Sequence, residues 1–182
     1  GYLFLVFPLA GGDSTAQPWA AGAWTGVVFQ ALGHGLAKAA MFLCAGLWIV
    51  AVGSDRLDAL RGLARALPMT AMAFAIAAIT LMGLPPSGGF TAKYLMMTTA
   101  FASGQVVWGL VLLGGGLLAA AYLYRPMAAL FAREIPDFTP VPRYLQAVPL
   151  VLALLAVAMG ILSDGIYAFV QIGRPGSAEE GL

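Results

Sequence analysis

Apolar residues in this chain gather in long stretches that short polar segments separate. Four of these stretches cover about residues 22–52, 68–101, 106–131 and 145–171. Each is long enough for a membrane-spanning helix, which needs about 20 predominantly apolar residues. No alternation of apolar and polar positions, the pattern of a half-buried strand, competes with them. The pattern therefore predicts an all-α fold, a polytopic bundle of membrane helices.

The second stretch contains a break. Residues 83–89 include two prolines and three glycines, which cannot continue a helix. An ordinary turn between two surface helices is disfavoured, because 68–84 and 90–101 are each marginal or too short to span a membrane alone. We therefore predict one discontinuous helix, with unwound backbone buried in protein or lining a cavity, as at the ion sites of transporters. The residues of this helix break are Gly83, Pro85, Pro86, Gly88 and Gly89.

The first stretch is longer than one membrane crossing requires. As a helix, residues 22–52 would extend roughly 46 Å, whereas the hydrocarbon core is about 30 Å thick. We expect this helix to tilt, to bend near Gly33 and Gly35, or to emerge from the membrane. Close helix packing is expected at the G-x-x-x-G pattern of residues 22–26 and at glycines 114–116. Three tryptophans suit the membrane–water interfaces: Trp24, Trp48 and Trp108.

Composition supports a membrane protein and excludes several other classes. Of the 182 residues, 61% are hydrophobic and only 9% are charged, with a mean hydropathy of +0.89; soluble domains carry about 25% charged residues. A net charge of +1 provides no basic field for nucleic acid. One cysteine and one histidine exclude a disulfide framework, a cysteine-based metal site and a histidine cluster. No phosphate-binding loop or nucleophile triad is present, so we predict no cofactor and no catalysis by this chain alone.

The start of the chain indicates a piece of a longer protein. Gly1 is not an initiator methionine, and the apolar residues 2–10 are too short to cross a bilayer. A signal peptide would place basic residues ahead of such a stretch, but the first lysine or arginine is Lys38. We therefore interpret residues 2–10 as the end of a helix that begins outside this sequence.

Arginine placement predicts the orientation. Segments 54–67 and 125–144 fall on one side of the membrane and hold six arginines: Arg56, Arg61, Arg65, Arg125, Arg133 and Arg143. The other side holds one arginine, Arg174. The positive-inside rule places the first side in the cytoplasm, and we expect the membrane to be a bacterial inner membrane.

Three ionisable residues lie deep in the apolar stretches. Lys38 is about midway along 22–52, and His34, four residues earlier, projects from the same helical face. Lys93 lies eight residues before the end of its stretch, or roughly 12 Å along a helix. A lysine at the bilayer centre costs about 2.5–3.5 kcal/mol on insertion scales, which favours a functional role for both lysines.

The chemistry that suits such lysines is proton transfer. Burial disfavours the ammonium form, so a buried lysine can gain and lose a proton near neutral pH, whereas an arginine stays protonated. Neutral His34 beside Lys38 can accept that proton and pass it on. The structural alternatives are a lysine paired with a carboxylate of a neighbouring helix, and a histidine bonded to a helix carbonyl. Asp164 is a candidate proton-exit carboxylate; the alternative is a wetted residue near the interface.

The same residues resemble a known family. Residues 34–46 are similar to the His-x-x-x-Lys-x-x-x-Phe-x-x-x-Gly helix of antiporter-like subunits, and 60–68 to the loop that follows it. Residues 83–93 resemble the broken helix of these subunits with its lysine, and 1–3 the end of the preceding helix. Such subunits pump protons in respiratory complex I, Mrp-type sodium/proton antiporters and membrane-bound hydrogenases. The resemblance covers residues 1 to about 131.

The resemblance implies a half-channel built on the C-terminal one of two inverted helix repeats. By it, Lys38 would be the central relay lysine, Lys93 the lysine toward the exit, and His34 a connecting group. Four parts are expected: 1–131 as the C-terminal portion of the proton-conducting domain, 132–144 as a cytoplasmic loop, 145–171 as an additional transmembrane helix and 172–182 as a polar tail. The other repeat, with its Glu–Lys pair, would lie outside this chain.

Two functions of different kinds follow. The first is a proton-translocating or cation/proton-translocating membrane subunit, whose partners are other membrane subunits, the lipid bilayer and protons or Na⁺. Within an NADH:quinone oxidoreductase-like complex it would be a membrane subunit without catalysis of its own. The alternative is a truncated, non-conducting scaffold that packs against such subunits. A third possibility, a quinone-binding subunit, has no matching headgroup site in the sequence.

Overall fold

The structure is a computed structural model, and it describes residues 1–10, 20–134 and 137–171. All regular elements in these ranges are helical. They are a 3₁₀ turn (Tyr2–Leu5), α1 (Val6–Ala10), α2 (Ala20–Val52), α3 (Pro68–Met82), α4 (Gly88–Ala102), α5 (Val106–Leu130), α6 (Arg143–Ile161) and α7 (Ser163–Gln171), with two short 3₁₀ turns, Leu57–Leu60 and Leu63–Arg65, between α2 and α3. The predicted all-α membrane bundle is confirmed. By length and apolarity α2, α5 and α6 can each cross a membrane.

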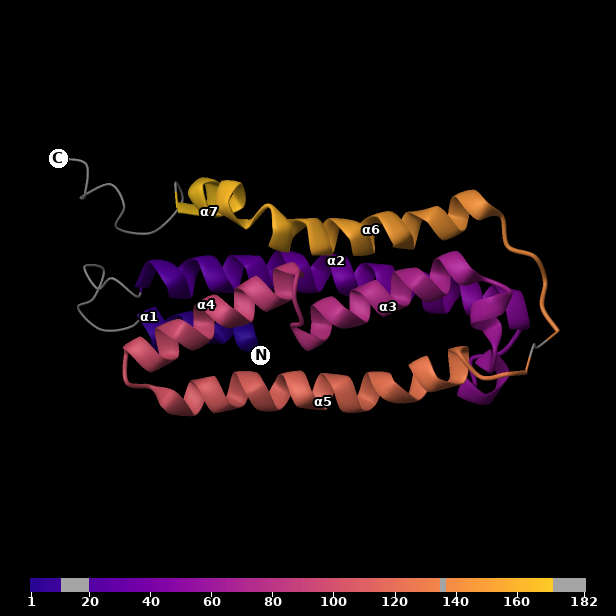
Figure 1. Cartoon of the computed structure of the whole chain (residues 1–182), viewed down its shortest axis with the longest axis horizontal. Helices are drawn as coiled ribbons and strands as arrows, with labels where there is room; N and C mark the ends of the chain where they lie inside the picture. The colour runs from indigo at the N-terminus through magenta and orange to yellow at the C-terminus, as the bar shows by residue number, and fades with distance from the viewer. Residues whose placement is uncertain (11–19, 135–136, 172–182) are drawn as a thin grey trace.

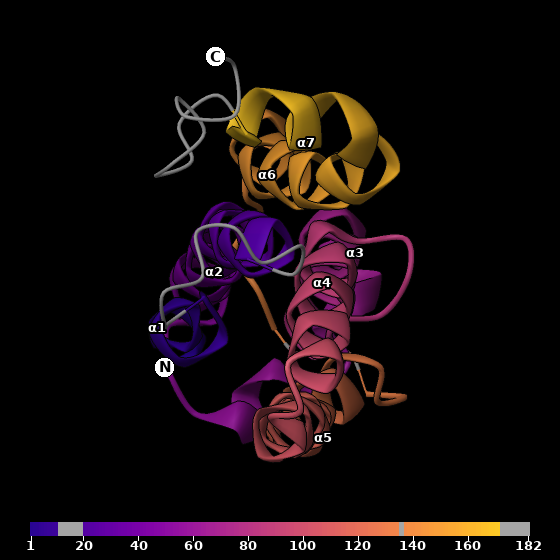
Figure 2. The same ribbon diagram turned by 90° about the vertical axis from the view of Figure 1, so that its left-hand side faces the viewer.

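The helices run along a common long axis (Figure 1). α3 and α4 follow one another beside α2, while α5 and α6 lie on different sides of them (Figure 2). α2 continues through Gly33 and Gly35 without interruption. With 33 residues it extends about 50 Å, which exceeds the hydrocarbon core. α2 is therefore one continuous helix that is longer than a single crossing requires.

The predicted discontinuous helix is confirmed. α3 ends at Met82 and is capped by Gly83, whose φ of +78° is the left-handed conformation that favours glycine. α4 is capped by Ser87, whose Oγ accepts a hydrogen bond from the Phe90 amide at 3.2 Å. Gly88 and Gly89 form the first turn of α4 rather than unwound backbone. A Cβ on Gly89 would collide with the backbone of Thr80, so this glycine permits the close approach of α4 to the end of α3.

Small residues bring the helices together. A Cβ on Gly26 would contact Met96 and the Ala92 carbonyl of α4, so the G-x-x-x-G face of α2 packs closely against α4 as expected. At the other end of α2, Trp48 is 2% exposed, and its Nε1 donates to Thr70 Oγ1 at 2.8 Å. Trp48 thus packs inside the bundle, where a buried hydroxyl on α3 satisfies its indole N–H.

The apolar stretch 145–171 is divided at Leu162 into α6 and α7. α6 runs along the bundle, whereas α7 lies across its end (Figures 1 and 2). α7 is fixed to α2: Trp24 Nε1 donates to the Val170 carbonyl at 3.3 Å, and Gln171 Nε2 donates to Thr25 Oγ1 at 2.6 Å. The candidate membrane span is therefore α6 alone, with 19 residues from Arg143 to Ile161.

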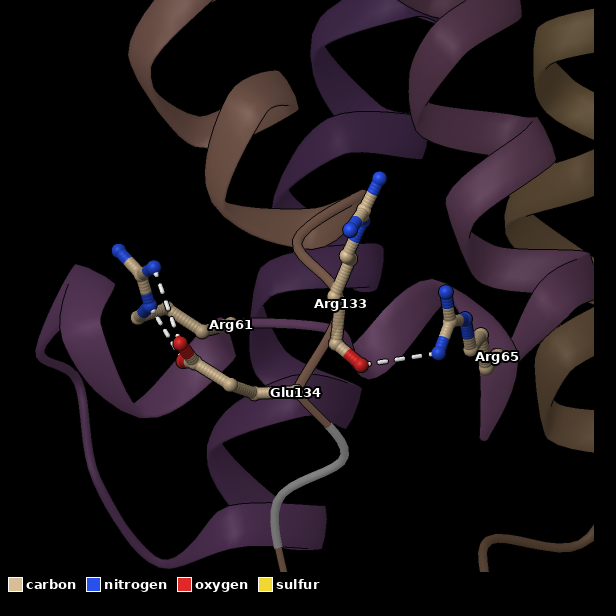
Figure 3. A network of polar contacts seen from close by, with 4 residues as sticks. All are labelled: Arg61, Arg65, Arg133 and Glu134. Atoms are coloured by element: carbon tan, nitrogen blue, oxygen red, sulfur yellow. Dashed lines mark hydrogen bonds and ion pairs between the residues drawn. The ribbon is translucent and has the colours of Figure 1, made fainter.

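A polar clamp closes the arginine-rich end of the bundle (Figure 3). Arg61 forms a two-pronged ion pair with Glu134, with Nε–Oε2 and Nη2–Oε1 distances of 2.6 and 3.2 Å. Arg65 donates to the Arg133 carbonyl at 2.9 Å, and the Gly62 amide donates to the Ala129 carbonyl at 2.9 Å. The ion pair lowers the pKa of Glu134 and raises the pKa of Arg61. The clamp joins the α2–α3 connection to the end of α5.

Candidate functional site

Lys93 lies just after the break, in the second turn of α4, and only 9% of its surface is exposed. Its Nζ donates hydrogen bonds to the carbonyl oxygens of Leu81 at 3.2 Å and Met82 at 2.7 Å. These carbonyls belong to the last turn of α3, where a helix carries partial negative charge and carbonyls without intrahelical partners. The break therefore supplies the acceptors that hold a lysine inside the bundle.

Two acceptors suit both protonation states of Lys93. The ammonium group has three N–H donors, and the neutral amine keeps two of them. Two carbonyls can therefore stay hydrogen-bonded when the third proton leaves. Among the residues that the structure describes, the two ion pairs present are Arg56–Asp58 and Arg61–Glu134, and neither includes Lys93. Proton loss would thus strand no buried carboxylate, as it would in an ion pair.

Glycines provide the space for the Lys93 side chain. A Cβ on Gly83 would collide with the Cδ and Nζ atoms of Lys93. On α5, a Cβ on Gly116 would lie 3.2 Å from Lys93 Nζ and 3.1 Å from the Met82 carbonyl. Gly115 similarly leaves room for the Tyr2 hydroxyl. Glycines 114–116 are therefore more than a helix-packing patch, since two of them accommodate polar side chains.

Lys38 and His34 lie on α2, one helical turn apart. Lys38 is half-buried, and its Nζ lies 5.9 Å from the centre of the Tyr122 ring on α5, within the range of a cation–π contact. His34 is exposed on the surface of the described chain and lines a cavity. The structure therefore places both residues on the side of α2 that faces this cavity and α5.

The cavity has a volume of about 510 Å³. Its polar lining consists of Tyr2, Gln30, His34 and Tyr122. Tyr2 also lies against Lys93, whose Nζ is 5.9 Å from the centre of the Tyr2 ring. One wall of the cavity thus includes the ring that faces Lys38, and another includes the ring that faces Lys93. A second cavity, of about 440 Å³, includes Lys93 itself in its lining.

Asp164 is placed apart from this group. It is exposed in the first turn of α7, and it does not appear among the described residues that line either cavity. α7 contacts α2 at Trp24 and Thr25. Thr25 precedes His34 by nine residues, or roughly 14 Å along the helix. Of the predicted site residues, His34 lines the 510 Å³ cavity and Lys93 lines the 440 Å³ cavity, whereas Asp164 lines neither.

Sequence reasoning missed three residues of the site. Gln30 lies four residues before His34, which lies four residues before Lys38. This spacing places all three on one helical face, and it was the signal available in the sequence. Tyr2 and Tyr122 gave no such signal, because each reaches the site through contacts with helices that are distant in the sequence. Within the described residues, no group of three His, Cys, Asp or Glu side chains could hold a metal ion.

Comparison with known proteins identifies the family. The transmembrane family described as NADH:quinone oxidoreductase/Mrp antiporter matches residues 16–119, more than half of the chain. The chain belongs to this family. The matched region contains the two lysines, the histidine and the helix break, and this confirms the resemblance to antiporter-like subunits.

Relatives of this family come from more than one kind of complex. The chain is 39% identical over 116 residues to NADH-quinone oxidoreductase subunit 14 of Thermus thermophilus, covering 61% of this chain and 27% of that protein. It is 28% identical over 151 residues to a Na⁺/H⁺ antiporter subunit of Bacillus subtilis, covering 80% of this chain and 30% of that protein. The chain thus spans less than a third of the length of these relatives.

Solved structures of the family share the fold. A chain of the Mrp complex from Dietzia sp. DQ12-45-1b superposes with a TM-score of 0.80 at 24% identity, over 93% of this chain and 39% of that one. A chain of respiratory complex I from Thermus thermophilus superposes with a TM-score of 0.65 at 26% identity, over 92% of this chain and 42% of that one. The overall arrangement of helices is therefore shared with these two chains.

Proposed function

We propose that this chain is part of a proton-translocating membrane subunit and that Lys38 and Lys93 relay protons within it, with His34 as a connecting group. The observation that carries the proposal is the environment of Lys93. A buried amine held by two carbonyls at a helix break keeps its hydrogen bonds in both protonation states. An amine in this environment can give up and regain a proton without disrupting the fold around it.

Membership of the family supports the wider assignment. Relatives of two kinds, oxidoreductase subunits and sodium/proton antiporter subunits, match this chain. The similar solved structures are chains of multi-subunit complexes. We therefore propose that the whole protein acts beside other membrane subunits of a complex I-like, Mrp-type or hydrogenase complex and moves protons or exchanges them for Na⁺.

The parts of the chain are proposed to divide this work unequally. Residues 1–131 would form the C-terminal portion of the conducting domain, since they contain both lysines and the break. Residues 132–144 would form a cytoplasmic connection, and the stretch 145–171 would supply, through α6, an additional membrane span that braces the break. The polar tail 172–182 lies outside the described residues. With the arginine-rich end in the cytoplasm of a bacterial cell, α7 would lie at the outer surface of the inner membrane.

Substitution of the lysines in the full-length protein, together with its partner subunits, tests the proposal. Proton flux is measured in proteoliposomes with a pH-sensitive dye, and assembly by co-purification of the partners. We expect Lys38→Ala and Lys93→Ala to abolish flux while assembly is retained. Lys38→Arg and Lys93→Arg should also abolish flux, because arginine keeps its proton at neutral pH.

A matched control removes a polar group from α4, the helix that carries Lys93, at a position away from the site. Thr98 is exposed on α4, and its hydroxyl donates to the carbonyls of Tyr94 and Leu95 in its own helix, each at 3.0 Å. Thr98→Val should therefore leave flux unchanged. Full flux in both arginine variants would overturn the relay and leave the two lysines with a structural role.

A further inference from the structure

Tyr2 reaches the helix break from the start of the chain. Its side chain is half-buried, and Lys93 Nζ lies over its ring, 5.9 Å from the ring centre. The hydroxyl occupies the space that Gly115 leaves free on α5, because a Cβ on this glycine would collide with it. The face of the ring, rather than the hydroxyl, is therefore the part of Tyr2 that meets the lysine.

The segment that carries Tyr2 is held in place by packing. Leu5 is buried in a core that residues of α2, α4 and α5 share, and Gln105 Nε2 donates to the Pro8 carbonyl. The Tyr2 hydroxyl donates to the Leu112 carbonyl at 3.5 Å, which is long compared with the usual O–H···O distance of about 2.7–2.8 Å. We therefore expect the position of the ring to depend little on the hydroxyl.

The helices around Lys93 offer it no opposite charge. α1, α2, α3, α5 and α6 all contact α4, and in the part of the chain that the structure describes none of them has a carboxylate side chain. Their titratable side chains are His34 and Lys38 on α2, Tyr122, Tyr124 and Arg125 on α5, and Arg143 and Tyr144 on α6, while Tyr94 follows Lys93 on α4. The charged groups among these are cations, which disfavour a positive charge on a neighbouring amine. The face of an aromatic ring, in contrast, attracts a cation.

We propose that Tyr2 is a positioning residue for Lys93, and that its ring holds the ammonium group against the two carbonyls of α3 and favours the protonated amine. The consequence for transport rests on the proposed function. A ring attracts a cation but not a neutral amine, and the attraction is larger where water is excluded. Lys93 is 9% exposed, so the ring acts in such surroundings. The position of the N-terminal segment therefore influences the release of a proton from Lys93.

Rings of graded electron density test this role. In the full-length protein with its partner subunits, Tyr2 is replaced by phenylalanine, or by phenylalanines with one, two or three fluorines through stop-codon suppression. Fluorine withdraws electrons from the ring face and changes the ring shape little. Proton flux in proteoliposomes is measured over a pH series, and the readout is the alkaline half-point, the pH above which flux falls below half of its maximum.

We expect Tyr2→Phe to keep the native half-point, because it retains the ring. Each added fluorine should move the half-point to lower pH, because a weaker ring lets the amine lose its proton earlier. Tyr2→Leu should lower it by about one pH unit. The control is Tyr124→Leu, which removes an exposed ring of α5 that belongs to neither lysine–tyrosine contact. It should leave the half-point unchanged. A merely structural ring would not produce a graded response to fluorine.

Thermal unfolding in detergent tests the contact without any transport. We expect Tyr2→Leu to lower the unfolding midpoint more in the native background than in Lys93→Met, because methionine carries no charge for the ring to attract. Equal losses in the two backgrounds, or a half-point that fluorination does not move, would overturn the inference. Lysine variants that lose flux would then still leave the proposed function standing. Full flux in the arginine variants would overturn the proposed function instead, and the unfolding measurements would still decide whether the ring acts on the charge of Lys93.

Discussion

Lys93 and Lys38 differ in the neighbours that stabilise them. Each Nζ lies 5.9 Å from the centre of a tyrosine ring, Tyr122 for Lys38 and Tyr2 for Lys93. Lys93 also donates to two backbone carbonyls. Carbonyl oxygens can accept from either protonation state of an amine, whereas the attraction of a ring for a cation exists only while the amine is charged. The two carbonyls therefore distinguish the surroundings of Lys93 from those of Lys38.

Gly116 allows the hydrogen bonds of Lys93 to be tested without changing the lysine. A Cβ at this position would lie 3.2 Å from Lys93 Nζ and 3.1 Å from the carbonyl that accepts its shorter hydrogen bond. Gly116→Ala should therefore displace the amine from Met82 and lower proton flux several-fold in proteoliposomes, although alanine favours the helix more than glycine does.

The control for this substitution lies two residues away. A Cβ on Gly114 would meet no atom within 4 Å, so Gly114→Ala makes the same change in helix propensity without touching Lys93. We expect it to retain full flux. Equal flux in the two variants would show that the position of the amine against α3 does not matter for transport.

Among the elements, the broken helix could be predicted from the sequence, and the bend between α6 and α7 could not. The break has a local cause, since prolines and glycines at 83–89 stop a helix in any surroundings. The bend at Leu162 follows from hydrogen bonds of α7 to Trp24 and Thr25, which lie more than 140 residues earlier. Hydropathy continues through Leu162, so the pattern alone predicts one long helix.

α6 supports the break from the side. A Cβ on Gly160 would collide with the backbone of Pro86 and Ser87, and a Cβ on Gly88 would contact Met159 and the Ala156 carbonyl. The backbones of α6 and the break therefore touch at these positions. This contact keeps the break covered by protein, which unwound backbone inside a membrane requires.

We expect Gly160→Ala to destabilise the protein, because a backbone collision cannot be relieved by rotating a side chain. Overpacking of this kind costs about 1–3 kcal/mol, so the midpoint of thermal unfolding in detergent should fall. Gly165→Ala on α7 is the control, since a Cβ there would meet nothing within 4 Å. If the two variants unfold at the same temperature, α6 does not brace the break.

The Arg61–Glu134 clamp gives the cytoplasmic connection a pH dependence. The ion pair lowers the pKa of Glu134, so its contribution to stability is fully present above the unfolded value of about 4.3 and is lost as the pH falls through the folded value. Arg61→Ala should speed hydrogen exchange of the Gly62 amide, which bonds to Ala129, at neutral pH. The difference from the native chain should disappear in acid; a difference that persists there would exclude the ion pair as its cause.

At the scale of the whole molecule, the sequence predicts the lysines but not the cavity that their neighbouring tyrosines line. Lysines in apolar stretches are visible as single exceptions in a local pattern. The cavity lining comes from the start of the chain, from α2 and from α5, where Tyr2 and Tyr122 meet. Their meeting depends on how the helices pack, and a single sequence gives no measure of that packing. For the same reason, the place of Gln30 in this lining could be found only from the structure.

The orientation of the bundle is the last prediction. The ends of α2 and α5 and the starts of α3 and α6 gather at one end, while the α4–α5 turn lies at the other (Figure 1). The gathered end carries the described arginines of the loops, and the positive-inside rule places it in the cytoplasm; Arg174 lies outside the described residues. Asp58 is exposed at this end, in the turn Leu57–Leu60.

In whole cells, Asp58→Cys should therefore resist a membrane-impermeant maleimide until the cells are permeabilised. Ala102→Cys, exposed beside the α4–α5 turn at the opposite end, should react from outside, which shows that the reagent reaches the protein. The native Cys44 is fully buried and adds no background. Labelling of Asp58→Cys but not Ala102→Cys in intact cells would reverse the topology. Because the two lysines keep their order along the bundle, it would also exchange the sides from which a proton enters and leaves.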